Sequence, residues 1–119
     1  TWTQENLAIM VMIGTAQAVE NAEAILAVDG VVGCFIGPAD LALSLEAAST
    51  GPGTTHEAAI QEVLRAAKSV GKVPGKHCTR ASEVSQRIGE GFQFLALSND
   101  AALMQKAAQE AFAAVDYGE

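Results

Sequence analysis

Residues 29–45 read DGVVGCFIGPADLALSL, and this stretch decides the fold class. Residues 31–36 are apolar or small at every position, a pattern typical of a strand in a parallel sheet that is covered on both faces. Gly37 and Pro38 end the strand, and residues 39–45 have the pattern of a short helix. The stretch therefore predicts a strand, a turn and a helix of an α/β protein.

The same unit recurs along the chain. Three more apolar runs predict strands, and four more helical patterns alternate with them. The predicted strands are residues 7–13, 72–77 and 92–97, and the predicted helices are residues 16–27, 57–70, 81–90 and 101–115. A capping box of Thr54 and Glu57 and a cap at Asn99 are predicted to start two of these helices. Strand–helix units in series predict a parallel sheet, either doubly wound or part of a (β/α)8 barrel.

Length and charge limit the possible functions. A chain of 119 residues forms one domain at most, and its composition, half hydrophobic with 5% aromatic residues, suits an α/β protein. The net charge is −7, and the seven basic residues are scattered along the chain. Nucleic acid is therefore not an expected partner, because binding to its phosphates requires clustered Lys and Arg.

Membrane and secretion signals are not found in the sequence. No apolar run approaches the roughly 18 residues that a membrane span needs, and the N-terminus does not have the pattern of a secretory leader. Cys34 and Cys78 lie in separate apolar segments rather than in a CxxC pair, so we expect both to be reduced core residues. These features predict a cytoplasmic protein with no membrane partner.

The turn after residues 31–36 is the strongest candidate site. Gly37 lets a ligand approach the backbone, and the N–H groups of Gly37, Ala39 and Asp40 are predicted to be free at a helix N-terminus, which favours an anion. Asp40 also places a carboxylate at the carboxyl end of a strand, where parallel α/β folds bind ligands. The structural alternative is that Asp40 only caps the helix.

The order of these motifs resembles the HpcH/HpaI aldolase family. The resemblance rests on the buried strand followed by GPADL, on the Asp-Gly-Val turn before it, and on the preceding AVENAEAILAV helix. It implies that residues 10–13, 31–36, 72–77 and 92–97 are the fifth to eighth strands of a TIM barrel. Residues 1–119 would then be a single partial domain, the C-terminal half of the barrel. Because Thr1 is not Met and a strand follows closely, we expect further sequence upstream.

The resemblance also implies an activity. Members of this family are metal-dependent carbon–carbon lyases that cleave 2-oxo-4-hydroxy acids reversibly to pyruvate and an aldehyde. A divalent cation chelated by pyruvate stabilises the enolate. Asp40 matches one ligand of this cation, which would be Mg²⁺, Mn²⁺ or Co²⁺. Gly37, Ala39 and Asp40 match the pocket for the carboxylate of a pyruvate-type 2-oxo acid.

One departure from the family pattern affects the metal. The family has Ile-Glu-Thr at the end of the fifth strand, whereas this chain has Ile13-Gly14-Thr15. Gly14 removes a carboxylate ligand, so we expect weakened binding of the cation. The family's general-base His and substrate-binding Arg also belong to the half of the barrel that this chain lacks. A catalytically inactive half-barrel with a role in assembly is therefore the alternative function.

Several other polar residues have structural explanations. His56 is predicted at the surface, and His77 is predicted to be structural rather than catalytic. Residues 98–100 are expected to cap the last helix. Lys72 and Lys76 do not have the surroundings that a Schiff-base lysine needs.

The predicted half-barrel has two open sheet edges, and such edges tend to pair with another chain. We therefore expect either a homo-oligomer or completion by the missing N-terminal half of the barrel. Family members exchange their last helix between subunits, and the apolar face of residues 101–115 suits that role. Packing on the chain's own sheet is the alternative for this helix.

Overall fold

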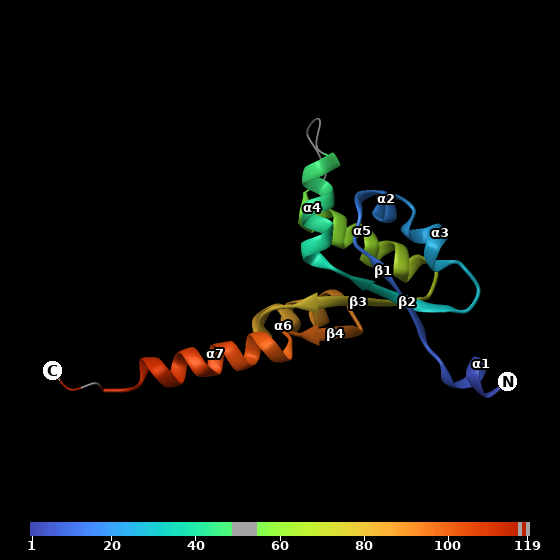
Figure 1. The fold of residues 1–119 in the computed structure, drawn as a ribbon. Coiled ribbons are helices and arrows are strands. Elements are labelled where there is room, and N and C mark those ends of the chain that lie inside the picture. The colour runs from blue at the N-terminus through green and yellow to red at the C-terminus, as the bar shows by residue number, and fades with distance from the viewer. Residues whose placement is uncertain (49–54, 117, 119) are drawn as a thin grey trace.

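The structure of the protein is a computed structural model that describes residues 1–48, 55–116 and 118, except for the side chain of residue 4. Helices and strands alternate along almost the whole chain (Figure 1). In order they are α1 (Trp2–Asn6), β1 (Ile9–Ile13), α2 (Ala16–Glu20), α3 (Ala22–Leu26), β2 (Val31–Ile36), α4 (Pro38–Ala48), α5 (His56–Ser69), β3 (Val73–Cys78), α6 (Ala81–Glu90), β4 (Phe94–Leu97) and α7 (Asp100–Ala113).

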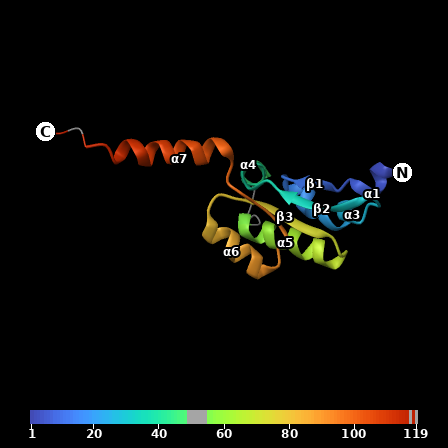
Figure 2. The same ribbon diagram turned by 90° about the horizontal axis from the view of Figure 1, so that it is seen from below.

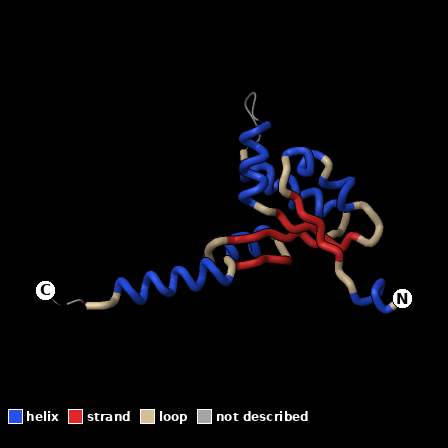
Figure 3. The backbone as a smooth tube through the Cα atoms, viewed as in Figure 1, coloured by secondary structure: helices blue, strands red, loops and turns tan. Residues whose placement is uncertain are grey.

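The four strands form one parallel sheet in the order β1-β2-β3-β4 (Figure 3). This order decides between the two predicted architectures. In a doubly wound sheet the strand order reverses at a switch point. In a barrel each new strand lies beside the strand that precedes it in the sequence. The chain therefore has the fold of a partial (β/α)8 barrel with four of its strands, as the sequence predicts.

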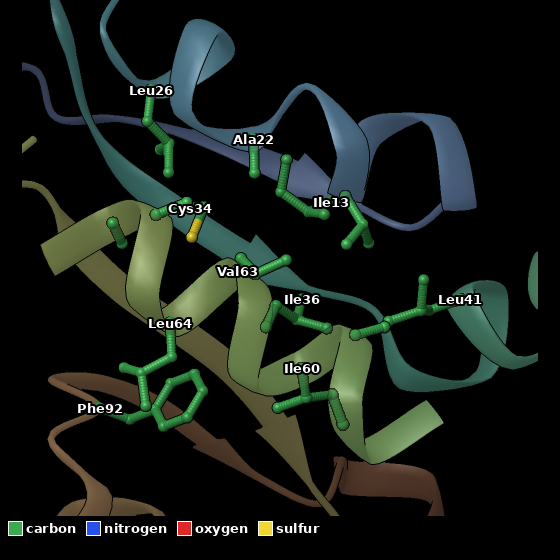
Figure 4. Close-up of a cluster of buried hydrophobic side chains, with 14 of the residues drawn as sticks. Ile13, Ala22, Leu26, Cys34, Ile36, Leu41, Ile60, Val63, Leu64 and Phe92 are labelled. Atoms are coloured by element: carbon green, nitrogen blue, oxygen red, sulfur yellow. The ribbon is translucent and has the colours of Figure 1, made fainter. Parts of the chain in front are cut away.

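The hydrophobic core lies between one face of this sheet and the helices α2, α3 and α5 (Figure 4). Ile13, Cys34 and Ile36 are completely buried on that face, and Ile60 and Val63 of α5 pack against them. Burial raises the pKa of the Cys34 thiol, which therefore stays protonated and unreactive. Both cysteines are free and buried, as expected from the sequence.

Local chemistry shifts several of the predicted boundaries. The predicted helix 16–27 is wrong as a single element, because Asn21 leaves the helical conformation and its side chain donates to the Gln17 carbonyl. The predicted helix 39–45 is longer, starting at Pro38, a residue favoured in the first helical position. Thr54 of the predicted capping box lies outside the described residues, and Thr55 caps α5 instead.

Two ion pairs fasten α6 to the rest of the molecule. Arg87 of α6 is 5% exposed and donates to both carboxylate oxygens of Glu57 on α5, at 2.6 and 2.7 Å. Lys76 of β3 is 2% exposed and donates to Glu83 of α6 at 2.6 Å. Within the part of the chain that the structure describes, Nε of Arg87 has no hydrogen-bond partner. These pairs fix the orientation of α6, since separating either pair would leave a charge buried without a partner.

Helix α7 projects away from the sheet and ends far from α1 (Figures 1 and 2). None of its residues is buried, and Leu103, Met104 and Phe112 are 54%, 71% and 69% exposed. The radius of gyration is 18.0 Å, against about 13.5 Å for a compact domain of this length. Packing of this helix on its own sheet, one of the two alternatives from the sequence, is therefore wrong.

The Arg87–Glu57 pair makes a prediction about pH. The hydrogen bonds from Arg87 lower the pKa of Glu57 from 4.5 to about 2. A carboxylate with a lowered pKa stabilises the fold above its unfolded pKa, and this contribution is lost as the pH falls from 4.5 towards 2. The Glu57 side chain is 55% exposed, so the effect is about 1 kcal/mol or less.

Glu57→Gln should therefore lower the free energy of unfolding near neutral pH and flatten its decline below pH 4.5. Urea unfolding of both proteins across this pH range measures the difference. Glu110→Gln, which removes an exposed partner of Lys106 on α7, is the matched control and should leave the curve unchanged. The prediction would be contradicted if the free energy of unfolding declined equally with falling pH in the original chain and in Glu57→Gln.

Candidate functional site at the carboxyl ends of the strands

The carboxyl ends of β1 and β2 meet at one edge of the sheet and carry the predicted site. Ile13 pairs with Ile36, so Gly14 and Gly37 follow at the same level. The chain then enters α2 through Thr15, whose side chain accepts from the Ala18 N–H. Ser44 of α4 accepts a hydrogen bond from Ala16 N–H at 3.0 Å and ties the two helices together at this edge.

The turn from Gly37 to Asp40 differs in one respect from the prediction. Gly37 N–H donates to the Ile13 carbonyl at 3.2 Å and extends the β1–β2 ladder, so it is not free to bind an anion. Leu41 N–H makes the first helical bond, to the Gly37 carbonyl. Only the N–H groups of Ala39 and Asp40 are without a partner among the described residues. Fewer backbone N–H groups are therefore free at this turn than the sequence predicts.

Asp40 lies inside the first turn of α4 and does not cap it, so the capping alternative is wrong. Its side chain is exposed and extends over the two glycines. A Cβ on Gly37 would lie 2.8 Å from Oδ2 of Asp40, and a Cβ on Gly14 would lie 3.2 Å from Cβ of Asp40. The absence of side chains at Gly14 and Gly37 thus gives the Asp40 carboxylate its position at the end of β1.

A divalent cation does not have a complete set of protein ligands here. Among the residues that the structure describes, no three His, Cys, Asp or Glu side chains gather in one place. Gly14 faces Asp40 where the resemblance would place a glutamate, so one carboxylate stands alone. Mg²⁺ and Mn²⁺ bind through several oxygen ligands, and a single carboxylate does not fit such a cation as a tight site.

Other predicted candidates are tied into the structure. His77 Nε2 lies 3.1 Å from the Ser98 carbonyl and joins β3 to the end of β4, in keeping with a structural role. Lys76 is paired with Glu83 on the helix-covered face, and Lys72 donates to the Val31 carbonyl. Neither lysine points towards the carboxyl ends of the strands as a Schiff-base residue would.

His56 differs from its prediction as a surface residue. It is partly buried, and its Nε2 lies 2.9 Å from the Pro38 carbonyl. This contact connects the start of α5 to the turn that carries Asp40. The sequence does not signal it, because the two residues are 18 positions apart and separated by a complete helix.

The end of β4 has an unusual backbone. Ser98 is the only described non-glycine residue with a positive φ, at 59°, a conformation that costs an L-residue about 1–2 kcal/mol. Asn99 then caps α7 by accepting from the Ala102 N–H at 2.8 Å, as predicted. Asp100 accepts from Ala101 N–H at the start of the same helix.

No described helix is long and apolar enough to cross a bilayer.

Four parallel strands in sequential order, with the polar turn at their carboxyl ends, define part of a (β/α)8-barrel protein. Residues 2–107 match the family described as HpcH/HpaI aldolase/citrate lyase, and the chain belongs to this family. The resemblance predicted from the sequence is therefore confirmed.

Two curated relatives are similar to this chain over about nine tenths of its length. It is 36% identical over 111 residues to a hydroxypyruvate/pyruvate aldolase from Rhizorhabdus wittichii, covering 92% of this chain and 44% of the relative. It is 32% identical over 108 residues to a 5-keto-4-deoxy-D-glucarate aldolase from Klebsiella pneumoniae, covering 91% of this chain and 42% of that protein. The chain thus spans less than half the length of these relatives.

Solved structures agree with this placement. An HpcH/HpaI aldolase from Desulfitobacterium hafniense superimposes with a TM-score of 0.85 at 28% identity, over 98% of this chain and 45% of that chain. An HpcH/HpaI aldolase/citrate lyase family protein from Burkholderia cenocepacia superimposes with a TM-score of 0.82 at 30% identity, over 92% of this chain and 42% of that chain. Both comparisons support a partial barrel.

The positive φ of Ser98 predicts a stabilising substitution. Ser98→Gly should raise the free energy of unfolding by about 0.5–1 kcal/mol, because glycine adopts this conformation without strain. Chemical denaturation measures it. The matched control is Ser85→Gly in the exposed part of α6, where glycine should destabilise by about 0.5 kcal/mol. A loss of stability in Ser98→Gly would show that its conformation is not strained.

Proposed function

We propose that this chain is the C-terminal half of a carbon–carbon lyase that cleaves 2-oxo-4-hydroxy acids reversibly to pyruvate and an aldehyde. The observation that carries the proposal is the Asp40 carboxylate at the carboxyl end of β2, in a turn whose Ala39 and Asp40 N–H groups have no partner among the described residues. Membership of the aldolase family and the names of the two relatives support the substrate class.

The residues of this half would bind and orient the 2-oxo acid. The N–H groups of Ala39 and Asp40 point out of the first turn of α4 and suit the substrate carboxylate, because a helix N-terminus favours negative charge. Gly37 has no side chain, which lets the ligand reach these groups. His56 would hold the turn in place through the Pro38 carbonyl. Proton transfer is assigned to the preceding half of the barrel.

A divalent cation, Mg²⁺, Mn²⁺ or Co²⁺, would bind only weakly in this proposal. Asp40 supplies one carboxylate, and Gly14 leaves the opposite position without a ligand. Losing one of two anionic ligands removes both charge and geometry from a site for a hard cation. When bound, such a cation supplies a Lewis acid for the keto oxygen of the substrate.

The second candidate is a catalytically inactive half-barrel with a role in assembly, and Gly14 is the observation that favours it. A barrel in which glycine replaces the second metal ligand would keep its fold and its subunit contacts while losing turnover. A cytoplasmic location is part of either proposal and is supported by the two free, buried cysteines.

The deciding experiment is a calorimetric titration of the purified chain with Mn²⁺ in excess pyruvate, beside the Gly14→Glu variant. The backbone at Gly14 does not have a positive φ, and its added Cβ needs Asp40 to move by only a few tenths of an ångström. We expect little heat from the original chain and saturable binding, tighter by roughly tenfold or more, in Gly14→Glu.

Gly14→Gln is the matched control, since it has nearly the same shape without the charge, and it should not gain binding. Asp40→Asn combined with Gly14→Glu should lose it again. Tight binding by the original chain would show that another group supplies the second ligand. If no variant binds, the Asp40 turn is not a preformed site and the assembly role is favoured.

We also propose that α7 binds another copy of the chain. Its apolar residues Leu103, Met104 and Phe112 are each more than half exposed, and no residue of the helix is buried. An apolar face of this kind is stable in water only when another surface covers it. This projecting helix suits exchange between subunits.

Met104→Glu together with Phe112→Glu should weaken this association, because it places two charges on the apolar face of α7. Multi-angle light scattering should show a smaller assembly, while circular dichroism stays unchanged. Lys106→Glu, on the same helix and already 74% exposed, is the control for charge alone. An unchanged mass in the double variant would rule α7 out as an interface.

A further inference from the structure

The Pro38–Ala39 peptide carries one of the two free N–H groups of the Asp40 turn. Pro38 is the first residue of α4 and has no N–H, so Ala39 and Asp40 supply the free donors of this turn among the described residues. The Ala39 N–H and the Pro38 carbonyl belong to the same planar amide and point in opposite directions. A group that holds the carbonyl therefore also sets the direction of the N–H.

His56 holds this carbonyl from another helix. It is the first residue of α5, it is half-buried, and its Nε2 lies 2.9 Å from the Pro38 oxygen. A carbonyl oxygen can only accept, so Nε2 carries the proton and donates. In an α-helix the same oxygen also accepts from the N–H four residues later, and its second lone pair leaves room for His56.

The packing of α5 fixes the position of the imidazole ring. Thr55 caps this helix by accepting from the Ala58 N–H at 3.2 Å. Ala59 and Ile60, in the same first turns, are buried in the core on the helix-covered side of the sheet. His56 is therefore carried by a rigid, packed element, and its contact with the turn does not depend on what lies on the other face of the sheet.

The other hydrogen bonds that hold α4 do not reach this peptide. The bond of the Gly37 N–H precedes it, and the bond of Ser44 lies in the second turn of the helix. Among the described residues, His56 has the only side chain that hydrogen-bonds to the Pro38–Ala39 peptide. Removing this side chain should therefore change the Ala39 N–H without displacing α4.

We propose that His56 is a positioning residue of the 2-oxo acid site, which orients and polarises the Ala39 N–H by donating to the Pro38 carbonyl. A hydrogen bond to the oxygen of an amide draws electron density from its nitrogen, so the N–H becomes a stronger donor to the substrate carboxylate. His56 acts through the peptide and does not touch the substrate. This inference rests on the proposed function, because that proposal assigns the substrate carboxylate to the N–H groups of Ala39 and Asp40.

The test is an NMR titration of the isotope-labelled full chain with pyruvate in excess Mg²⁺, beside His56→Leu and His56→Gln. Leucine fills the space without a donor, whereas the side-chain amide of glutamine places an N–H where Nε2 lies. In His56→Leu the amide nitrogen signal of Ala39 should move upfield in the free chain, and the Kd for pyruvate should rise about threefold or more. His56→Gln should restore both values, which excludes the aromatic ring itself as their cause.

Lys72→Met is the matched control, because it also removes a side-chain donor from a carbonyl, that of Val31 at 2.5 Å, at the opposite end of β2. It should leave the Ala39 signal and the Kd unchanged. The proposal is overturned if His56→Leu leaves both unchanged, if His56→Gln behaves like His56→Leu, or if Lys72→Met weakens pyruvate binding equally. If the original chain binds no pyruvate, the proposed function fails, and the Ala39 signal of the free chain still decides whether His56 acts on this amide.

Discussion

Parallel sheets are normally buried on both faces, because the helices that connect their strands cover them. This requirement shapes the whole molecule. Cys34 and Ile36 of β2 pack on Ile60 and Val63 of α5, and the buried residues of α2 and α3 belong to the same core. Right-handed connections in one direction produce this one-sided arrangement, which closes into a barrel only when eight strands are present. The four strands described here have their core on one face, and Met12 and Phe94 on the other face are 63% and 50% exposed.

The sequence predicts the strands, the helices that alternate with them and the parallel sheet well. Runs that are hydrophobic at consecutive positions identify the four strands, and the strand–helix order identifies the parallel sheet. The misses have local causes. Asn21 breaks the second predicted helix because its side chain competes for a backbone carbonyl, and Pro38 starts α4 earlier than its apolar pattern does. The position of α7 could not be predicted, since an apolar helix face does not specify the surface on which the helix packs.

The residues of the candidate site can be predicted from the sequence, but their hydrogen bonds cannot. The Gly-Pro-Ala-Asp turn places Asp40 at the end of a strand from sequence alone, and the structure puts it there. The engagement of Gly37 N–H by Ile13 depends on the register between two strands, which no local pattern contains. The His56 contact with Pro38 is likewise a product of the assembled fold. Both contacts make the turn more rigid than a helix N-terminus alone.

Gly14 links the fold to the proposed chemistry. The same missing side chain that removes a carboxylate also leaves the space into which Asp40 extends, since a Cβ at this position would lie 3.2 Å from that of Asp40. A glutamate there would need α4 to move slightly away from β1, and the bonds of Gly37 to Ile13 and of Ser44 to Ala16 hold α4 in place. The position of α4 and the number of carboxylates at this edge are therefore coupled. A change at residue 14 alters the geometry of the Asp40 turn as well as its charge.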